Sequence, residues 1–473
     1  MLEQYGKLLF DTGRDPEAQL IHRQLLVLHG DAPAAALDQT RLLILAQRGG
    51  KRRDLLSESK QLVEIVQRVR AASQTASVEQ DERYEEANRL GEETLRNLAV
   101  QIHNEARKTD LEETWAAARA LYAEYLVLFP KASDAYDLRF FYAELLYARD
   151  SKAEAAEQYE TVVGQDLAAS KPGRWLQKAA WSAVLARNEA MLHGRVEQKD
   201  VGERRAQRAL TADEKKLQDA CSLYLKALPD GPHAVEVAFK AGRLEYLSGD
   251  YDAARAHLSW IASTHPDHEL AEYAANLVLD IENLRGDWES VRRWALRFLE
   301  DRALAAHGTL MQDLKRVEEQ SAYALADTLT PDAKKADALL AFVREHPRGQ
   351  LTDKALFGAA AALSRIGRMD EALATRARVW KEQPHSALVP RALLASASDL
   401  AAIADLGEAA ALLERYAAGY QRQRSLEREQ RANPSRKSAP QGAVFEEAKA
   451  QSALQDAAVK RSWLRSRRRP MKA

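Results

Sequence analysis

Apolar positions recur along the chain with the spacing of amphipathic helices, and an alanine recurs among them with fixed followers. In the clearest instance Ala254 is followed by Leu258, Ile261 and Pro266. The same order is found in three other sets: Ala118, Tyr122, Tyr125 and Pro130; Ala220, Tyr224, Ala227 and Pro232; and Ala372, Val379 and Pro384, where Arg376 replaces the first large apolar member. Weaker sets without the proline are Ala155, Tyr159 and Val162, and Ala409, Leu413 and Tyr416. The pattern predicts a series of packed helices, four of which are closed by a proline that cannot continue the helix.

The alanines are regularly spaced. The separation is 34 or 37 residues, measured from Ala118 to Ala155, from Ala220 to Ala254 and from Ala372 to Ala409. A fixed period of this length is typical of a repeated helix-turn-helix unit. We therefore predict an array of helix pairs.

A turn signal stands just before the alanine in several units. It is Gly249-Asp250-Tyr251, Gly286-Asp287-Trp288, Gly367-Arg368-Met369 or Gly13-Arg14-Asp15. We expect the glycine to end the first helix in a left-handed cap and the residue after it to start the second helix. Upstream, small residues such as Ala241 and Gly242 lie among larger ones, which lets two paired helices approach closely.

With these residues the chain resembles the tetratricopeptide repeat family in its lengthened bacterial form, from Leu2 to Tyr416. The resemblance implies an all-α superhelix of roughly nine or ten helix pairs, whose concave face, built mainly from first helices, grips peptides or partner domains. The structural residues of the repeat are Ala118, Ala155, Ala220, Gly242, Ala254, Pro266, Ala372 and Pro384. By analogy with the groove of the family, the candidate partner-binding residues are Phe140, Glu144, Tyr147, Phe239, Arg243, Tyr246, Phe357 and Arg365. Alternatively, the aromatic members fill contacts between neighbouring repeats.

Three segments interrupt the period and divide the chain. Residues 57–110 predict two long charged helices joined by the polar stretch 71–80, and residues 193–211 form a charged insertion within one helix pair. Residues 421–442 are rich in Arg, Gln and Ser and predict a disordered linker before one further helix from about Val444 to Leu464. The expected domains are N-terminal repeats at 1–56, long helices at 57–110, the main solenoid at 111–420 and a basic, partly disordered tail at 421–473.

Composition and charge add two points. Gly and Pro are sparse, at 21 and 14 residues, and runs of β-branched residues are missing, so we expect no sheet. The formal net charge of −1 combines +9 in residues 421–473 with −10 in residues 1–420. A basic tail suits nucleic acid, anionic lipid or an acidic partner, or is simply a solvated, mobile terminus.

Catalytic and metal-binding patterns are missing from the sequence. Gly49-Gly50-Lys51 lacks the strand and the glycine spacing of a nucleotide loop and is interpreted as a turn between helices. His265 and His268 flank a repeat junction and lack a third ligand, so no metal is expected. Cys221, the only cysteine, lies on an apolar face and is interpreted as a buried structural thiol. We expect neither enzymatic activity nor a cofactor.

The sequence thus predicts a non-enzymatic scaffold that binds other proteins or peptides in a bacterial multi-protein assembly. Residues 97–110 and 135–159 are also similar to tetratricopeptide proteins of the cell envelope in gliding and predatory proteobacteria, which implies a motility or envelope complex. The alternative is a nucleic-acid-associated or regulatory protein acting through Lys460, Arg461, Arg465, Arg467, Arg468 and Arg469, with Trp463 for stacking.

The expected location follows from two absences in the sequence. No stretch reaches the ~18 apolar residues of a membrane span, and the start lacks the pattern of an export signal. We expect a soluble chain, cytoplasmic as it stands and periplasmic or outer-membrane-associated if an N-terminal signal is missing.

Overall fold

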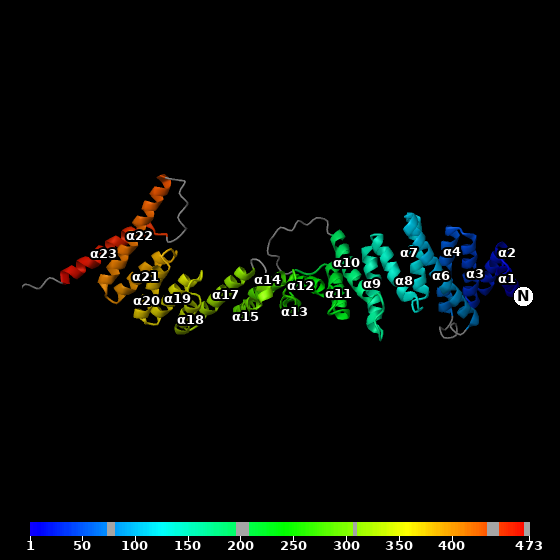
Figure 1. Cartoon of the computed structure of the whole chain (residues 1–473), viewed down its shortest axis with the longest axis horizontal. Helices are drawn as coiled ribbons and strands as arrows, with labels where there is room; N and C mark the ends of the chain where they lie inside the picture. Colours follow the sequence, from blue (N-terminus) through cyan, green and yellow to red (C-terminus); the bar gives the residue numbers. More distant parts are fainter. Residues whose placement is uncertain (73–80, 195–207, 306–309, 433–443, 468–473) are drawn as a thin grey trace, which may run out of the picture. The chain divides into compact units, whose positions relative to one another are not determined.

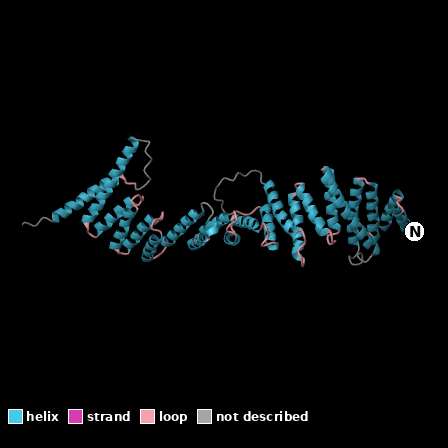
Figure 2. Ribbon diagram, viewed as in Figure 1, coloured by secondary structure: helices cyan, strands magenta, loops and turns pink. Residues whose placement is uncertain are grey.

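A computed structural model describes residues 1–72, 81–194, 208–305, 310–432 and 444–467. Helices hold 83% of these residues, and none of them forms a strand (Figures 1 and 2). The expected all-α repeat fold without a sheet is therefore confirmed for this part of the chain. No described helix is both long enough and apolar enough to cross a bilayer.

The helices fall into two units, Met1–His257 and Leu258–Ala473. The first unit contains α1 (Leu2–Asp11), α2 (Asp15–His29), α3 (Pro33–Gly49), α4 (Arg52–Ala72), α6 (Glu82–Thr109), α7 (Glu112–Leu128), α8 (Ala135–Ala148), α9 (Lys152–Ala168), α10 (Leu176–Gly194), α11 (Ala212–Ala227) and α12 (Ala234–Ser248). The division falls within α13 (Tyr251–Thr264). The second unit contains α14 (Ala271–Arg285), α15 (Trp288–Glu300), α16 (Arg302–Ala305), α17 (Leu310–Asp327), α18 (Asp332–Glu345), α19 (Thr352–Arg365), α20 (Met369–Glu382), α21 (Val389–Ala402), α22 (Leu406–Ala432) and α23 (Glu447–Arg467).

In the first unit, α3 is the most enclosed helix because it packs against α2, α4 and α6. Even its polar residues Asp38 and Gln39 are buried. Asp38 binds the Nδ1 atoms of two histidines, His22 at 2.8 Å and His29 at 2.6 Å. Gln39 donates to the backbone oxygen of Glu58 at 3.0 Å, whereas the buried atoms Gln39 Oε1 and His22 Nε2 have no partner among the described residues. α4 and α6 are the long charged helices expected from the sequence, and the rest of their predicted connection, residues 73–80, lies outside the described residues.

The glycine turns end helices in the left-handed conformation, as predicted. Gly13, Gly249, Gly286 and Gly367 have φ values of 72°, 82°, 70° and 80°, a region that side chains with a Cβ rarely occupy. Gly50 ends α3 in the same way, with φ of 70°, so the Gly49-Gly50-Lys51 stretch is a turn between two helices.

The residue after the glycine decides how the second helix begins. Asp287 accepts a hydrogen bond from the Ser290 backbone N–H at 3.0 Å, and this bond together with the Ser290 hydroxyl lowers the pKa of the Asp287 carboxyl. Asp250 accepts in the same way from the backbone N–H of Ala253 at 3.3 Å. Arginine has no acceptor atom and cannot cap, so Arg14 pairs instead with the glutamate three residues later, at 2.5 Å.

The repeating alanines lie where helices touch. At most 2% of the surface of each of these residues is exposed: Ala118, Ala155, Ala220, Ala254, Ala372 and Ala409. Gly242 is also buried, inside α12, whereas Pro266 and Pro384 follow the ends of α13 and α20. Buried tyrosines beside the alanines keep their hydroxyls bonded, as when Tyr125 donates to Glu92 at 2.8 Å.

Arg376, which interrupts the apolar pattern of its repeat, is nonetheless buried in the second unit. It is 3% exposed and pairs with Asp399 of α21 at 2.7 Å. The apolar position is thus replaced by an ion pair between α20 and α21, which a pattern of apolar residues cannot reveal.

The C-terminal segment differs from the prediction. Residues 421–432 were expected to begin a disordered linker, but they are the last turns of α22. α23 folds back on α22, burying Ala450, Ala453 and Ala457, and Arg461 binds Glu414 at 2.5 and 2.7 Å. The prediction of a linker from residue 421 was wrong because Arg, Gln, Glu and Leu, which dominate residues 421–429, are strong helix formers even where they stay exposed. Residues 433–443 lie outside the described part of the chain.

The insertion expected at residues 193–211 is described only at its two ends. α10 continues through Gly194, and residues 195–207 lie outside the described residues. Thr211 then starts α11 with a reciprocal cap, in which the Thr211 hydroxyl accepts from the Glu214 N–H and the Glu214 carboxylate accepts from the Thr211 N–H.

Candidate interaction surface

The predicted groove residues of α8 are bonded to the helices that follow it. Glu144 accepts hydrogen bonds from the Tyr159 hydroxyl at 2.6 Å and from Lys178 Nζ at 2.8 Å. Tyr147 donates to Glu189 of α10 at 2.5 Å. These two polar side chains therefore connect α8 to α9 and α10.

Tyr147 and Lys152 share Glu189 as a partner. Lys152 Nζ lies 3.0 Å from a Glu189 carboxylate oxygen and 3.5 Å from the centroid of the Tyr147 ring. Burial, followed by the hydrogen bond to Glu189, raises the pKa of Tyr147 to about 12. The hydroxyl thus stays protonated at neutral pH and keeps donating to Glu189.

Phe140 does not lie on an open surface. Its side chain is 1% exposed, and its ring stacks on Trp175 with centroids 4.2 Å apart and planes 4° apart. Its assignment as an exposed groove residue is therefore wrong, because Trp175, in the turn just before α10, covers it. For Phe140 the alternative, an aromatic filling a contact between repeats, is the one observed.

On α12, the predicted groove residues are more accessible. Phe239 and Tyr246 are half-buried, and Arg243 is exposed. Arg243 forms no hydrogen bond or ion pair with any described residue. Lys240, which follows Phe239 in α12, donates to the Asn188 side chain of α10 at 2.9 Å, and burial lowers the pKa of this lysine. The Tyr246 ring lies 5.9 Å from that of Tyr251.

The two candidates on α19 lie in different surroundings. Phe357 is half-buried and packs against the core of the second unit. Arg365 is exposed but forms two hydrogen bonds to Asp332, both of 2.7 Å. A partner that used Arg365 must therefore displace a carboxylate or share it.

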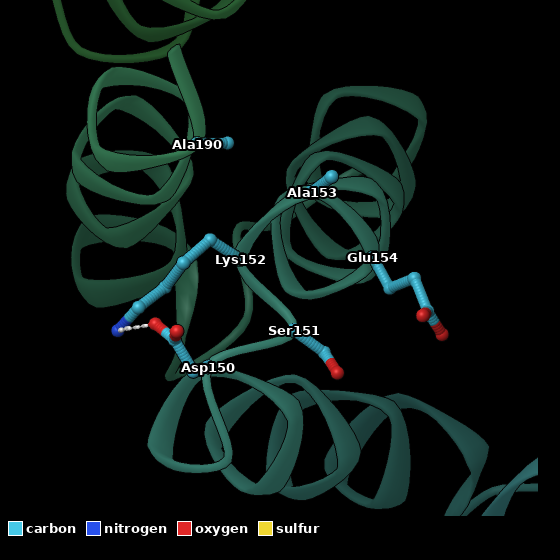
Figure 3. Close-up of a pocket in the computed structure, with 6 residues that line it drawn as sticks. All are labelled: Asp150, Ser151, Lys152, Ala153, Glu154 and Ala190. Carbon is cyan, nitrogen blue, oxygen red and sulfur yellow. Dashed lines mark ion pairs between the residues drawn. The ribbon is translucent and has the colours of Figure 1, made fainter. Parts of the chain in front are cut away.

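A pocket of about 270 Å³ lies where α8 turns into α9 (Figure 3). It is lined by Asp150, Ser151, Lys152, Ala153 and Glu154 from this turn and by Ala190 from α10. Lys152 points toward Asp150 at 4.0 Å (Figure 3), so its ammonium is already surrounded by Asp150, Glu189 and Tyr147. The pocket has a mixed charge and offers no unpaired cation for an anionic ligand.

Metal-binding and nucleophilic groups are not brought together. Within the described ranges, no three His, Cys, Asp or Glu side chains are grouped so that they could hold a metal ion. The His268 ring accepts from the Leu270 backbone N–H at 3.1 Å, and His265 packs on Trp260. Cys221 is buried, and burial raises the pKa of its thiol to about 12.

Another pocket is lined by residues that lie outside the predicted groove. It has a volume of about 220 Å³ and lies between α14, α15 and α17, with Asn276, Asn283 and Gln320 at its edge. A sequence pattern could have indicated these residues: Asn276, Asp280 and Asn283 stand at positions i, i+4 and i+7, a spacing that places polar residues on one face of a helix.

No protein-family model and no curated protein matches the sequence. Among solved structures, a tetratricopeptide repeat protein from Parabacteroides merdae has 11% identity and a TM-score of 0.26, covering 77% of this chain and 98% of that one. Yeast Tom70 has 12% identity and a TM-score of 0.25, covering 99% of this chain and 96% of its own. Since likeness this low does not extend to function, we assign the fold from the helices themselves. The described part of the chain is an all-α helical-repeat protein.

Proposed function

We propose that the chain is a tetratricopeptide-like scaffold without enzymatic activity, which binds other proteins or peptides along its first helices. The observation that carries this proposal is the face of α12, where Phe239 and Tyr246 are half-buried on either side of the exposed Arg243. Aromatic and arginine side chains are enriched among the residues that dominate binding energy. Arg243 is exposed and has no partner among the described residues, whereas Glu144 and Tyr147 of α8 are bonded and Phe140 is covered, which makes α12 the best candidate within the predicted groove.

The test compares α12 with the tail. A partner is first recovered with the intact chain as bait and then titrated calorimetrically against variants. Phe239→Ala combined with Tyr246→Ala is expected to weaken binding by about 2 kcal/mol or more, roughly thirtyfold, while the helical circular dichroism is unchanged. Tyr5→Ala, at a 48% exposed tyrosine of α1, is the matched control and is expected to bind normally. Unchanged affinity of the double variant contradicts the proposal.

A second candidate function uses the basic tail, and the exposure of Arg465 and of Trp463, at 41%, supports it. Arg461 is held by Glu414, and Arg468 and Arg469 lie outside the described residues. Lys460→Gln combined with Arg465→Gln tests this function better than removal of residues 421–473, which would cut into α22. Loss of binding in this variant, with a steep dependence on salt, would favour nucleic acid as the partner.

The cellular setting belongs to the same proposal. The similarity of residues 97–110 and 135–159 to envelope proteins of gliding proteobacteria supports a role in a bacterial envelope or motility assembly. Fractionation of the source bacterium with an antibody to the chain tests this setting. Recovery only in the soluble cytoplasmic fraction, away from any envelope protein, would contradict it.

A further inference from the structure

The pocket between α14, α15 and α17 has an apolar floor. Leu279 and Val291 are 6% and 2% exposed, and Trp288 and Val317 are half-buried beside them. The volume is about 220 Å³. A cavity of about 150 Å³ is known to admit a benzene molecule, so this floor has room for one branched aliphatic side chain.

The edge of the pocket carries three exposed amides without a protein partner in the described part of the chain. Asn276, Asn283 and Gln320 are exposed, and none of their side chains has a hydrogen-bond partner among the described residues. Each amide offers both a donor and an acceptor, which is the same pair of groups that a peptide bond presents.

The spacing of the amides fits an extended chain. Asn276 and Asn283 are seven residues apart on α14, and at 1.5 Å per residue this separation is about 10 Å along the helix. An extended peptide advances about 3.3 Å per residue, so the two amides are separated by about three of its residues. The middle of such a segment lies over the apolar floor.

The charge of the site selects among peptides. Asp280 lines the pocket and no Lys, Arg or His does, so a free C-terminal carboxylate finds no counter-charge there. Residues 271–327 together carry a formal charge of −4. These charges favour a segment with basic flanking residues.

We propose that this pocket binds an internal, extended peptide segment of a partner protein, in which an aliphatic side chain enters the floor and basic residues flank it. The inference rests on the proposed scaffold function and adds the class of ligand and a second place of contact besides α12. The hydrogen bonds to peptide groups and the burial of the aliphatic side chain do not involve a chain terminus. The segment can therefore lie anywhere within the sequence of the partner.

The test uses a display library of random nine-residue segments tethered at both ends, selected on the intact chain. Clones retained by the wild type and lost on Asn276→Ala/Asn283→Ala are expected to share a branched aliphatic residue and flanking Lys or Arg. The leading segment is then synthesised with an acetylated N-terminus and an amidated C-terminus, and its binding is measured by fluorescence anisotropy. The double asparagine variant is expected to bind it at least tenfold more weakly.

Two further variants make the test specific. Val317→Trp fills the floor and is expected to weaken binding by a similar factor, whereas Gln312→Ala, at an exposed amide of α17 outside the pocket, is expected to bind normally. Melting curves of all variants verify that the fold is kept.

Three outcomes overturn the inference. They are the absence of any clone that depends on the asparagines, tighter binding of the synthetic segment when its C-terminus is left as a free carboxylate, and equal binding by the Val317→Trp and Gln312→Ala variants. If a recovered partner still depends on Phe239 and Tyr246 in any of these cases, the scaffold function stands and only the pocket proposal fails.

Discussion

Gly419 lies in the middle of α22 and faces Phe445, which stands just before the start of α23. A Cβ added at this position lies 2.6 Å from two carbon atoms of the Phe445 ring. Phe445 packs on Tyr416, with centroids 5.2 Å apart, and its backbone N–H donates to Gln423 at 2.7 Å. Gly419→Ala therefore forces the Phe445 ring, and with it the start of α23, away from α22.

Two effects of opposite sign decide the size of the change. Alanine stabilises the interior of a helix by about 0.5 to 1 kcal/mol relative to glycine. Overpacking against a rigid ring costs about 1 to 3 kcal/mol, and the ring cannot yield without losing its contact with Tyr416. We expect the clash to dominate, with a net loss of about 1 kcal/mol for the docking of α23.

Hydrogen exchange measured by mass spectrometry reports this docking directly, because the amides of α23 lose protection when the helix detaches. Gly419→Ala is expected to speed exchange in α23. In a Phe445→Ala background the clash is absent, so the same substitution is expected to be stabilising, which gives a coupling of about 2 kcal/mol between the two sites. Gly164→Ala is the matched control, since Gly164 lies in α9 with no atom within 4 Å of an added Cβ.

The result that refutes this reasoning is an equal effect of Gly419→Ala in both backgrounds. Slower exchange in α23 of the single variant would also contradict it, because the gain in helix propensity would then exceed the cost of the clash.

Four further predictions concern stability and reactivity. Ala254→Leu is expected to cost about 1 to 3 kcal/mol, because Ala254 is fully buried; an unchanged melting temperature would show that its surroundings accommodate the larger side chain. Cys221 is expected to react with Ellman's reagent only after denaturation, since burial raises the pKa of its thiol to about 12, and rapid reaction of the native chain would contradict this expectation. Asp399→Ala leaves Arg376 buried without its carboxylate and is expected to cost about 2 to 3 kcal/mol in urea denaturation, but clearly less in an Arg376→Met background. Asp287→Ala is expected to cost about 1 kcal/mol at pH 7. The folded state lowers the pKa of this carboxyl, so its contribution is fully present above the unfolded value near 3.9 and decreases as the pH falls toward the folded pKa. The difference in stability between wild type and variant is therefore expected to be smaller at pH 3 than at pH 7.

Local features of the fold were predictable because they depend on neighbouring residues. A glycine in a turn signal ends a helix through its own φ angle, and an aspartate after it caps the next helix within three residues, as Asp287 does. An alanine such as Ala254 marks an interface because a larger side chain would separate the two helices. The sequence contains these determinants in a single short window.

Features that depend on distant residues were not predictable in the same way. Phe140 is covered by Trp175, which lies in the turn before α10, and a groove assignment by analogy takes no account of this contact. The end of α22 is polar, so no apolar period marks this stretch as helical, and in its last turns Gln423 and Arg424 contact the segment at the start of α23. The amide pocket requires Gln320 of α17 to lie near Asn276 of α14, which no local pattern specifies.

The bonds that join α8, α9 and α10 bear on how far this chain is modular. Helical repeats are often treated as exchangeable segments, each of which can be deleted, duplicated or grafted without harm to the others. Here Glu189 accepts from Tyr147 and lies 3.0 Å from Lys152, so excision of the helix pair α8–α9 would leave a half-buried carboxylate without both of those partners. Removal of α10 would in turn strip Tyr147 of its acceptor. Insertions and exchanges in this stretch must therefore carry α8 to α10 together as one exchangeable segment.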